Sequence, residues 1–174
     1  MRWPFCHRSA VAEPLDTLGP ATERAPLLEV QLQPEPFEPL QALVTWQAQL
    51  ALLPGGMPAA ESQFIGRVRG YDAIGEPLEA LELEHYPDMT EACILSLAAA
   101  AAGRHGAAAV LVRHRIGRVL PGQAIVLVAV AADRRGPAQR CCQELLEALK
   151  HEAPFWKREW SEGVGTWLTG NTAF

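Results

Sequence analysis

The chain has 174 residues, of which 49% are hydrophobic and 20% are charged, as in one ordinary globular domain. Its formal net charge of −5 disfavours a strongly cationic nucleic-acid-binding protein. The longest apolar run, residues 92–102, is too short to cross a bilayer, and the four cysteines have no disulfide or zinc spacing. We therefore expect a soluble, cytoplasmic protein that holds no metal.

The N-terminal part of the chain begins with an irregular segment. Residues 1–26 contain four prolines and no apolar period, which predicts a flexible extension ahead of a domain over residues 27–174. Alternating apolar and polar residues predict a strand over residues 28–32. Pro39 suits the first turn of a helix, and the expected apolar stripe of that helix is Leu40, Leu43, Val44 and Ala48.

The middle of the chain predicts two strands and a helix. Residues 62–69 and 78–85 have strand patterns, and the glycines and aspartate between them indicate a hairpin with a long loop. Asp88 and Glu91 have the spacing of a capping box at the start of an alanine-rich helix. We expect that helix to end at Gly103.

The C-terminal part predicts two further strands and a long helix. Residues 110–117 form one strand, and the nearly continuous apolar run 125–130 predicts a central one. The last helix begins at Pro137, ends before Pro154 and has an apolar stripe at Ala138, Cys141 or Cys142, Leu145 and Leu149. A short segment at Trp167 is expected to pair as a strand. This order predicts a mixed α+β domain whose helices cover a largely antiparallel sheet.

Arginines are concentrated at two places that suit an anion. Arg134 and Arg135 precede the last helix, where free N–H groups and the helix dipole favour negative charge. Alternatively, Asp133 caps this helix and the arginines face solvent. Arg67 and Arg69 project from one face of a strand, where two like charges repel unless an anion lies between them or solvent covers the face. Residues 101–174 carry 10 basic and 6 acidic residues, against 5 and 14 in residues 1–100, which also favours an anion site in the second half.

Lysine is rare in this chain. Of the 15 basic residues only Lys150 and Lys157 are lysines. A lysine can lose its proton when desolvated and then act as a nucleophile or proton carrier, which an arginine cannot do. The alternative is codon bias with two lysines left on the surface. The histidines lack metal spacing, so His85 and His114 are expected to be structural.

Four segments together resemble the large, catalytic subunit of molybdopterin synthase, the MoaE family. They are FIGRVR (residues 64–69), LELEHYPDMTE (81–91), HRIG (114–117) followed by Pro121-Gly122, and LKHEAPFWKRE (149–159). They occur in one order at matching spacings, and the likeness runs from about Leu27 to Trp167.

The resemblance implies an α/β hammerhead-type fold and a homodimer within a heterotetramer. Its partner is a small ubiquitin-like sulfur carrier whose Gly-Gly tail ends in a thiocarboxylate. The substrate is cyclic pyranopterin monophosphate, which receives two sulfurs to become molybdopterin, without a cofactor. In this chain Lys150 and Lys157 match the catalytic lysines, with Lys150 the first choice. The substrate-binding arginines correspond to Arg67, Arg69, Arg134, Arg135 and Arg158.

One departure from the family keeps other functions open. The family often has His-Arg before the last helix, whereas this chain has Arg134-Arg135. If that histidine carries a proton, Arg134 cannot replace it at neutral pH. A rival hypothesis is therefore an interaction subunit that binds the carrier but turns over poorly. A generic phosphate-binding module would also fit the arginines, but it leaves the lysines unexplained.

Overall fold

Three helices and eight strands follow one another in the computed structural model, which describes residues 25–168. The strands are β1 (Leu27–Gln33), β2 (Ala60–Arg67), β3 (Ala80–His85), β4 (Ala109–Arg115), β5 (Gly117–Val119), β6 (Ala124–Ala132), β7 (Phe155–Ser161) and β8 (Val164–Trp167). The helices are α1 (Pro39–Leu50), α2 (Met89–His105) and α3 (Arg135–His151), and none of them has the length and apolar character needed to cross a membrane. The predicted extension, residues 1–26, lies outside the described residues except for residues 25 and 26.

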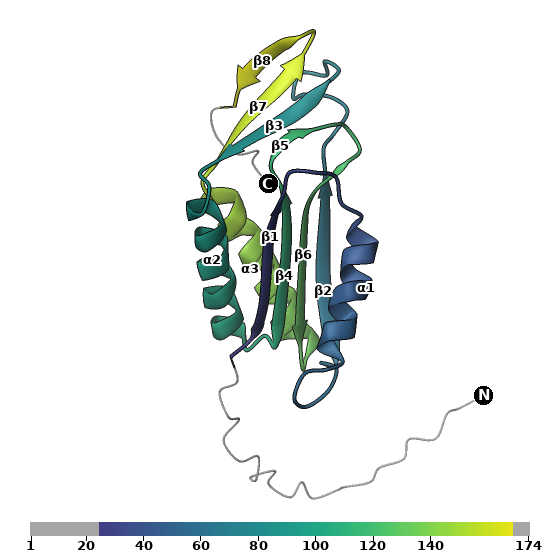
Figure 1. Cartoon of the computed structure of the whole chain (residues 1–174), viewed down its shortest axis with the longest axis vertical. Coiled ribbons are helices and arrows are strands. Elements are labelled where there is room, and N and C mark those ends of the chain that lie inside the picture. The colour runs from purple at the N-terminus through teal and green to yellow at the C-terminus, as the bar shows by residue number, and fades with distance from the viewer. Residues whose placement is uncertain (1–24, 169–174) are drawn as a thin grey trace, which may run out of the picture.

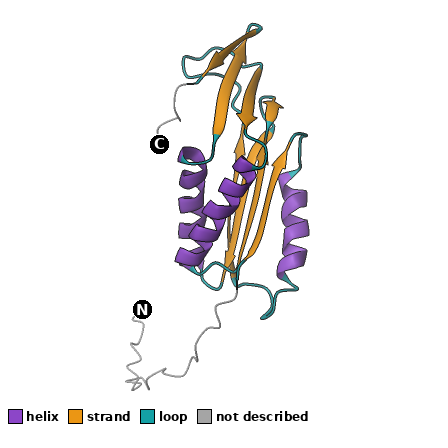
Figure 2. Cartoon of the chain, turned by 60° about the vertical axis from the view of Figure 1, so that its left-hand side comes forward, coloured by secondary structure: helices purple, strands orange, loops and turns teal. Residues whose placement is uncertain are grey.

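The larger sheet has the strand order β1-β4-β6-β2, in which β1 runs parallel to β4 and the other pairs are antiparallel. The helices α2 and α3 cover one face of this sheet and α1 covers the other (Figure 1 and Figure 2). Because both faces are covered, the inner strands β4 and β6 have almost uninterrupted apolar sequences. The prediction of a central strand over residues 125–130 is confirmed.

The smaller sheet is antiparallel, with the order β5-β3-β7-β8, and it stands at one end of the larger sheet (Figure 1). The chain passes from β4 in one sheet to β5 in the other at Arg115, which is only 2% exposed. The guanidinium of Arg115 donates to the carbonyl oxygens of Gln33, Pro34 and Arg118 at 3.1, 3.2 and 3.1 Å. We call this contact the Arg115 joint, because it links the strand ends of the two sheets.

The predicted mixed α+β class is confirmed, but the predicted hairpin is wrong. β2 pairs with β6, whereas β3 pairs with β5 and β7 in the other sheet. Apolar residues of β2 lie opposite apolar residues of β6, as Ile65 does opposite Leu127, so the best partner of β2 is distant in the sequence. The loop after β2 instead carries the chain from one sheet to the other.

Two details of the helices differ from expectation. In α1 the core side is Leu43, Trp46 and Leu50, and Leu40 and Val44 are exposed. The helix α2 continues past Gly103 and ends at Gly106, which has the left-handed φ of 62° that favours glycine. The capping-box prediction is also wrong. Asp88 makes no side-chain cap, and the N–H of Tyr86 donates instead to Thr90 Oγ1 at 3.1 Å.

Candidate functional site

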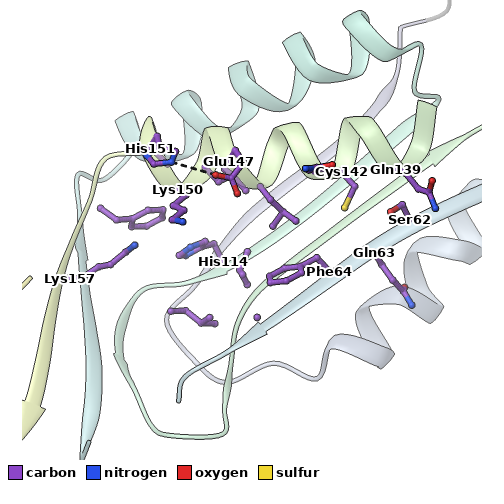
Figure 3. A pocket seen from close by; sticks show the side chains of 18 residues that line it. Ser62, Gln63, Phe64, His114, Gln139, Cys142, Glu147, Lys150, His151 and Lys157 are labelled. Atoms are coloured by element: carbon purple, nitrogen blue, oxygen red, sulfur yellow. Dashed lines mark ion pairs between the residues drawn. The ribbon is translucent and has the colours of Figure 1, made fainter. Parts of the chain in front are cut away.

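A pocket of about 870 Å³ opens between α3 from Gln139 to its end, the start of β7 and the face of the larger sheet (Figure 3). Apolar side chains, Phe64, Ile125, Val126, Leu146, Leu149, Ala153 and Phe155, form part of its wall. Polar side chains line it as well, namely Ser62, Gln63, His114, Gln139, Gln143, Glu147, Lys150, His151 and Lys157, and Gly66 and Cys142 complete the wall. This combination of apolar and clustered polar groups suits an organic ligand that carries charge.

Both lysines of the chain line this pocket at its α3–β7 end (Figure 3). Lys150 lies in the last turn of α3, and Lys157 is the third residue of β7. The short turn between these elements, closed by a 2.8 Å bond from Phe155 N–H to the Ala153 carbonyl, brings the two side chains together. Burial lowers the pKa of Lys157 below its ordinary value, and the positive charge of Lys150 lowers it further.

His114 lies beside the lysines and contributes a neutral ring. Its Nδ1 is 2.8 Å from the Arg115 carbonyl oxygen, and its ring stacks on Phe155 with centroids 4.2 Å apart and 15° between planes. Burial lowers the pKa of His114 to about 4. The hydrogen bond to the Arg115 carbonyl raises it by less, and the charge of Lys157 lowers it slightly further. The imidazole is therefore uncharged at neutral pH, and the two ammonium groups supply the positive charge at this end of the pocket.

The other titratable groups of the wall are less suited to chemistry. Glu147 and His151 form an ion pair at 3.5 Å one turn apart on α3. Cys142 is only 4% exposed, and burial raises the pKa of its thiol, which keeps it protonated and unreactive. Within residues 25–168 no three His, Cys, Asp or Glu side chains gather closely enough to hold a metal ion.

The five arginines predicted to bind substrate do not line this pocket in the described part of the chain. Arg67 donates to the Gly122 carbonyl at 3.1 Å, and Arg69 follows the end of β2. Arg158 points away from its neighbour Lys157 on β7; it pairs with Glu82 at 2.9 Å and with Glu84 at 3.4 Å.

The other two arginines lie at the start of α3, whereas Lys150 lies at its end. Arg134 is the N-cap residue of α3, and its side chain makes no capping hydrogen bond. The alternative prediction, in which Asp133 caps the helix, is therefore wrong. One chain alone thus brings together the lysines but not the arginines.

Only Lys150 and Lys157 of the pocket residues are predicted site residues, and two of the others, Gly66 and His114, matter for the geometry. Gly66 lies at a bulge of β2, where an added Cβ would be 2.8 Å from Val126 Cγ1, so only glycine allows this close approach of β2 to β6. His114 was expected to be structural, and the structure places its ring both in the packing and in the pocket wall. The sequence did not indicate this second role, because a histidine after an apolar run on a strand is typical of a protein core. The pocket also depends on β7, which the sequence pattern did not predict.

Comparisons with known proteins point to one family. The model of the MoaE protein family matches residues 41–152. A molybdopterin synthase catalytic subunit from Ralstonia nicotianae is 42% identical over 123 residues, which cover 70% of this chain and 69% of the relative. The solved structure of a molybdopterin biosynthesis MoaE protein from Burkholderia ambifaria has a TM-score of 0.66 at 34% identity, and the match covers 86% of this chain and 92% of that one.

A second solved structure supports the fold alone. It is the complex of subunits 1 and 2 of molybdopterin-converting factor from Helicobacter pylori, in which the matching chain has a TM-score of 0.64 at 21% identity. The match covers 80% of this chain and 88% of that one.

Proposed function

The chain belongs to the MoaE protein family, and from this membership we infer that it is the catalytic subunit of a molybdopterin synthase, an enzyme of molybdenum cofactor biosynthesis. We assign to it the conversion of cyclic pyranopterin monophosphate to molybdopterin, with sulfur from a thiocarboxylated small carrier subunit. The observation that carries this assignment is that both lysines line one large pocket. In the sequence, the end of a helix and a turn separate them. The three free cysteines of the described residues suit a reducing compartment, and we place the reaction in the cytoplasm.

The lysines act on charge and on protons. When sulfur attacks a carbonyl carbon of the pterin, negative charge develops on the oxygen, and a nearby ammonium both stabilises that charge and can give the oxygen a proton. The lowered pKa of Lys157 brings its proton closer to exchange at neutral pH. Lys150, the first choice of catalytic residue, supplies a second ammonium that stabilises the developing charge and can release its proton.

The proposed assembly is a homodimer with one small carrier subunit at each end. The carrier tail would enter the pocket and present its sulfur to the pterin beside the lysines. Because Arg134 and Arg135 lie at the far end of α3 from Lys150, they serve the same substrate only if a second copy of the chain brings them there. This makes the dimer a functional requirement of the proposal.

The test is single-turnover conversion of cyclic pyranopterin monophosphate by the full chain mixed with thiocarboxylated carrier. We expect molybdopterin to form, and the same carrier with an ordinary C-terminal carboxylate to give none. If the carrier binds but no product forms, the chain is the interaction subunit that Arg134 suggested as a rival. If the carrier does not bind at all, the assignment is wrong and a phosphate-binding module is left.

A further inference from the structure

The ring of His114 is held in one orientation and one tautomer. A carbonyl oxygen only accepts hydrogen bonds, so Nδ1, at 2.8 Å from the Arg115 carbonyl, carries the proton and donates it. The parallel stack on Phe155, a residue of β7, keeps the ring of this β4 residue from turning. The other nitrogen, Nε2, therefore holds an acceptor lone pair.

The His114 side chain is 9% exposed and lines the pocket, so a ligand in the pocket can reach this acceptor. A ligand that donates a hydrogen bond to this acceptor binds more tightly than a ligand that buries it without a donor. The lowered pKa keeps the lone pair unprotonated at neutral pH.

The groups around His114 define what a ligand must offer. Charged or titratable side chains face it from two elements: Glu147, Lys150 and His151 from α3, and Lys157 from β7. Glu147 lies 3.5 Å from His151, with which it pairs, and a ligand here also meets two lysine amines and one imidazole acceptor. Figure 3 shows His114 next to the amine ends of both lysines.

We propose that Nε2 of His114 accepts a hydrogen bond from a ring N–H of the substrate while the lysine amines contact the carbonyl or phosphate oxygens. This inference rests on the proposed function, and it assigns His114 as a substrate-binding residue that sets the orientation of the heterocycle. The pyrimidinone ring of a pterin carries an N–H beside a C=O, and this pair matches an acceptor placed beside ammonium donors. A ligand whose oxygens carry no hydrogen would contact the lysine amines but offer no donor to His114.

Two amide variants separate this role from a packing role. In His114→Asn the side-chain amide reaches the position of Nδ1 and leaves no acceptor at that of Nε2, whereas in His114→Gln the amide oxygen reaches the Nε2 position. Both variants lose the ring and its stack on Phe155, so a difference between them does not come from lost stacking. The measurement is calorimetric titration of the full chain, without carrier, with cyclic pyranopterin monophosphate.

We expect the Asn variant to bind about tenfold more weakly than wild type, as for one lost hydrogen bond, and the Gln variant to remain within about threefold. Titration with sulfate, whose oxygens carry no proton at neutral pH, is the control, and both variants should bind it like wild type. Equal affinity of wild type and the Asn variant for the pterin, or an equal loss in both variants, would overturn the role of His114. If wild type itself does not bind the pterin, the proposed function fails and this assignment fails with it.

Discussion

At the scale of single residues, the positive charges of Lys150 and Lys157 repel each other in the pocket. Burial lowers the pKa of Lys157, and the positive charge of Lys150 lowers it further. An anionic substrate would relieve the repulsion on entering. The pocket thus favours a negatively charged ligand before any specific contact is made.

We expect Lys150→Ala to abolish sulfur transfer, with a loss of roughly 10²–10⁴-fold in rate, because an ammonium that stabilises developing charge is removed. Alanine is the better helix former, so the melting temperature should hardly change. Lys150→Arg should not restore activity, since a guanidinium cannot release its proton and is larger. Single-turnover conversion by all three proteins checks this, and near-wild-type conversion by the Ala variant would leave Lys157 as the remaining candidate.

His114 should make the stability of the fold depend on pH. The folded protein keeps His114 neutral down to about pH 4, whereas an unfolded histidine takes up its proton near its ordinary pKa of 6.5. Between these values the unfolded state binds more protons, so the free energy of unfolding falls as the pH is lowered from 6.5 to 4. The expected loss is about 3 kcal/mol, at roughly 1.4 kcal/mol per pKa unit.

Urea unfolding at pH 7 and pH 4.5 measures this loss, with His114→Gln as the control. Glutamine does not titrate, while the carboxylates titrate in both proteins, so the difference between the two pH dependences isolates His114. Parallel pH dependences in the two proteins would contradict the prediction.

At the scale of elements, the end of α2 offers a matched pair of glycines. Gly106→Ala should destabilise the protein by about 1–2 kcal/mol, because it forces an alanine into a left-handed φ of 62°. Gly103→Ala, inside the helix, should stabilise it by roughly 0.5–1 kcal/mol. Neither added methyl group meets an atom within 4 Å, so backbone conformation alone separates the two. Urea unfolding of both variants tests the pair, and an equal effect would mean that the helix does not end at Gly106.

The elements that the sequence pattern predicts well are those with a clear apolar stripe or an uninterrupted apolar run. The stripe of α3 and the apolar run of β6 are confirmed, since Leu145 and Leu149 are buried and β6 is an inner strand. The strand β7 escaped prediction because its three central residues are charged, and pairing with β3 rather than burial makes it a strand. The stripe of α1 was misread because Trp46 lies on the core side in place of Val44.

At the scale of the whole molecule, the proposed dimer predicts complementation between two inactive variants. Lys150→Ala lacks an amine in its own pocket, and Arg135→Ala lacks a group that we assign to the partner's pocket. In a random mixture half of the dimers contain one copy of each variant, and each such dimer has one intact site of two. The mixture should therefore regain about a quarter of the wild-type activity.

Unfolding and refolding the variants together, followed by the turnover assay, makes this measurement. Light scattering at micromolar concentration should show a dimer in every sample. A mixture that stays inactive while dimers form would mean that Arg135 does not act across the dimer.

The sequence could predict part of the candidate site but not all of it. Lys150 and Lys157 stood out in the composition, and the structure brings them together. The acceptor role that we propose for His114 depends on which nitrogen meets the Arg115 carbonyl and on the stack with Phe155, and neither contact leaves a pattern in a linear sequence.

The Arg115 joint has a consequence for the lysines. Lys150 belongs to a helix packed on the larger sheet, and Lys157 belongs to a strand of the smaller one. A slight rotation of one sheet against the other would change the spacing of the two amines before it disturbed either sheet internally. The hydrogen bonds of Arg115 and the stack of Phe155 on His114 resist that rotation. Substitutions at this joint can therefore slow the reaction from outside the pocket, because they alter the distance between the two amines.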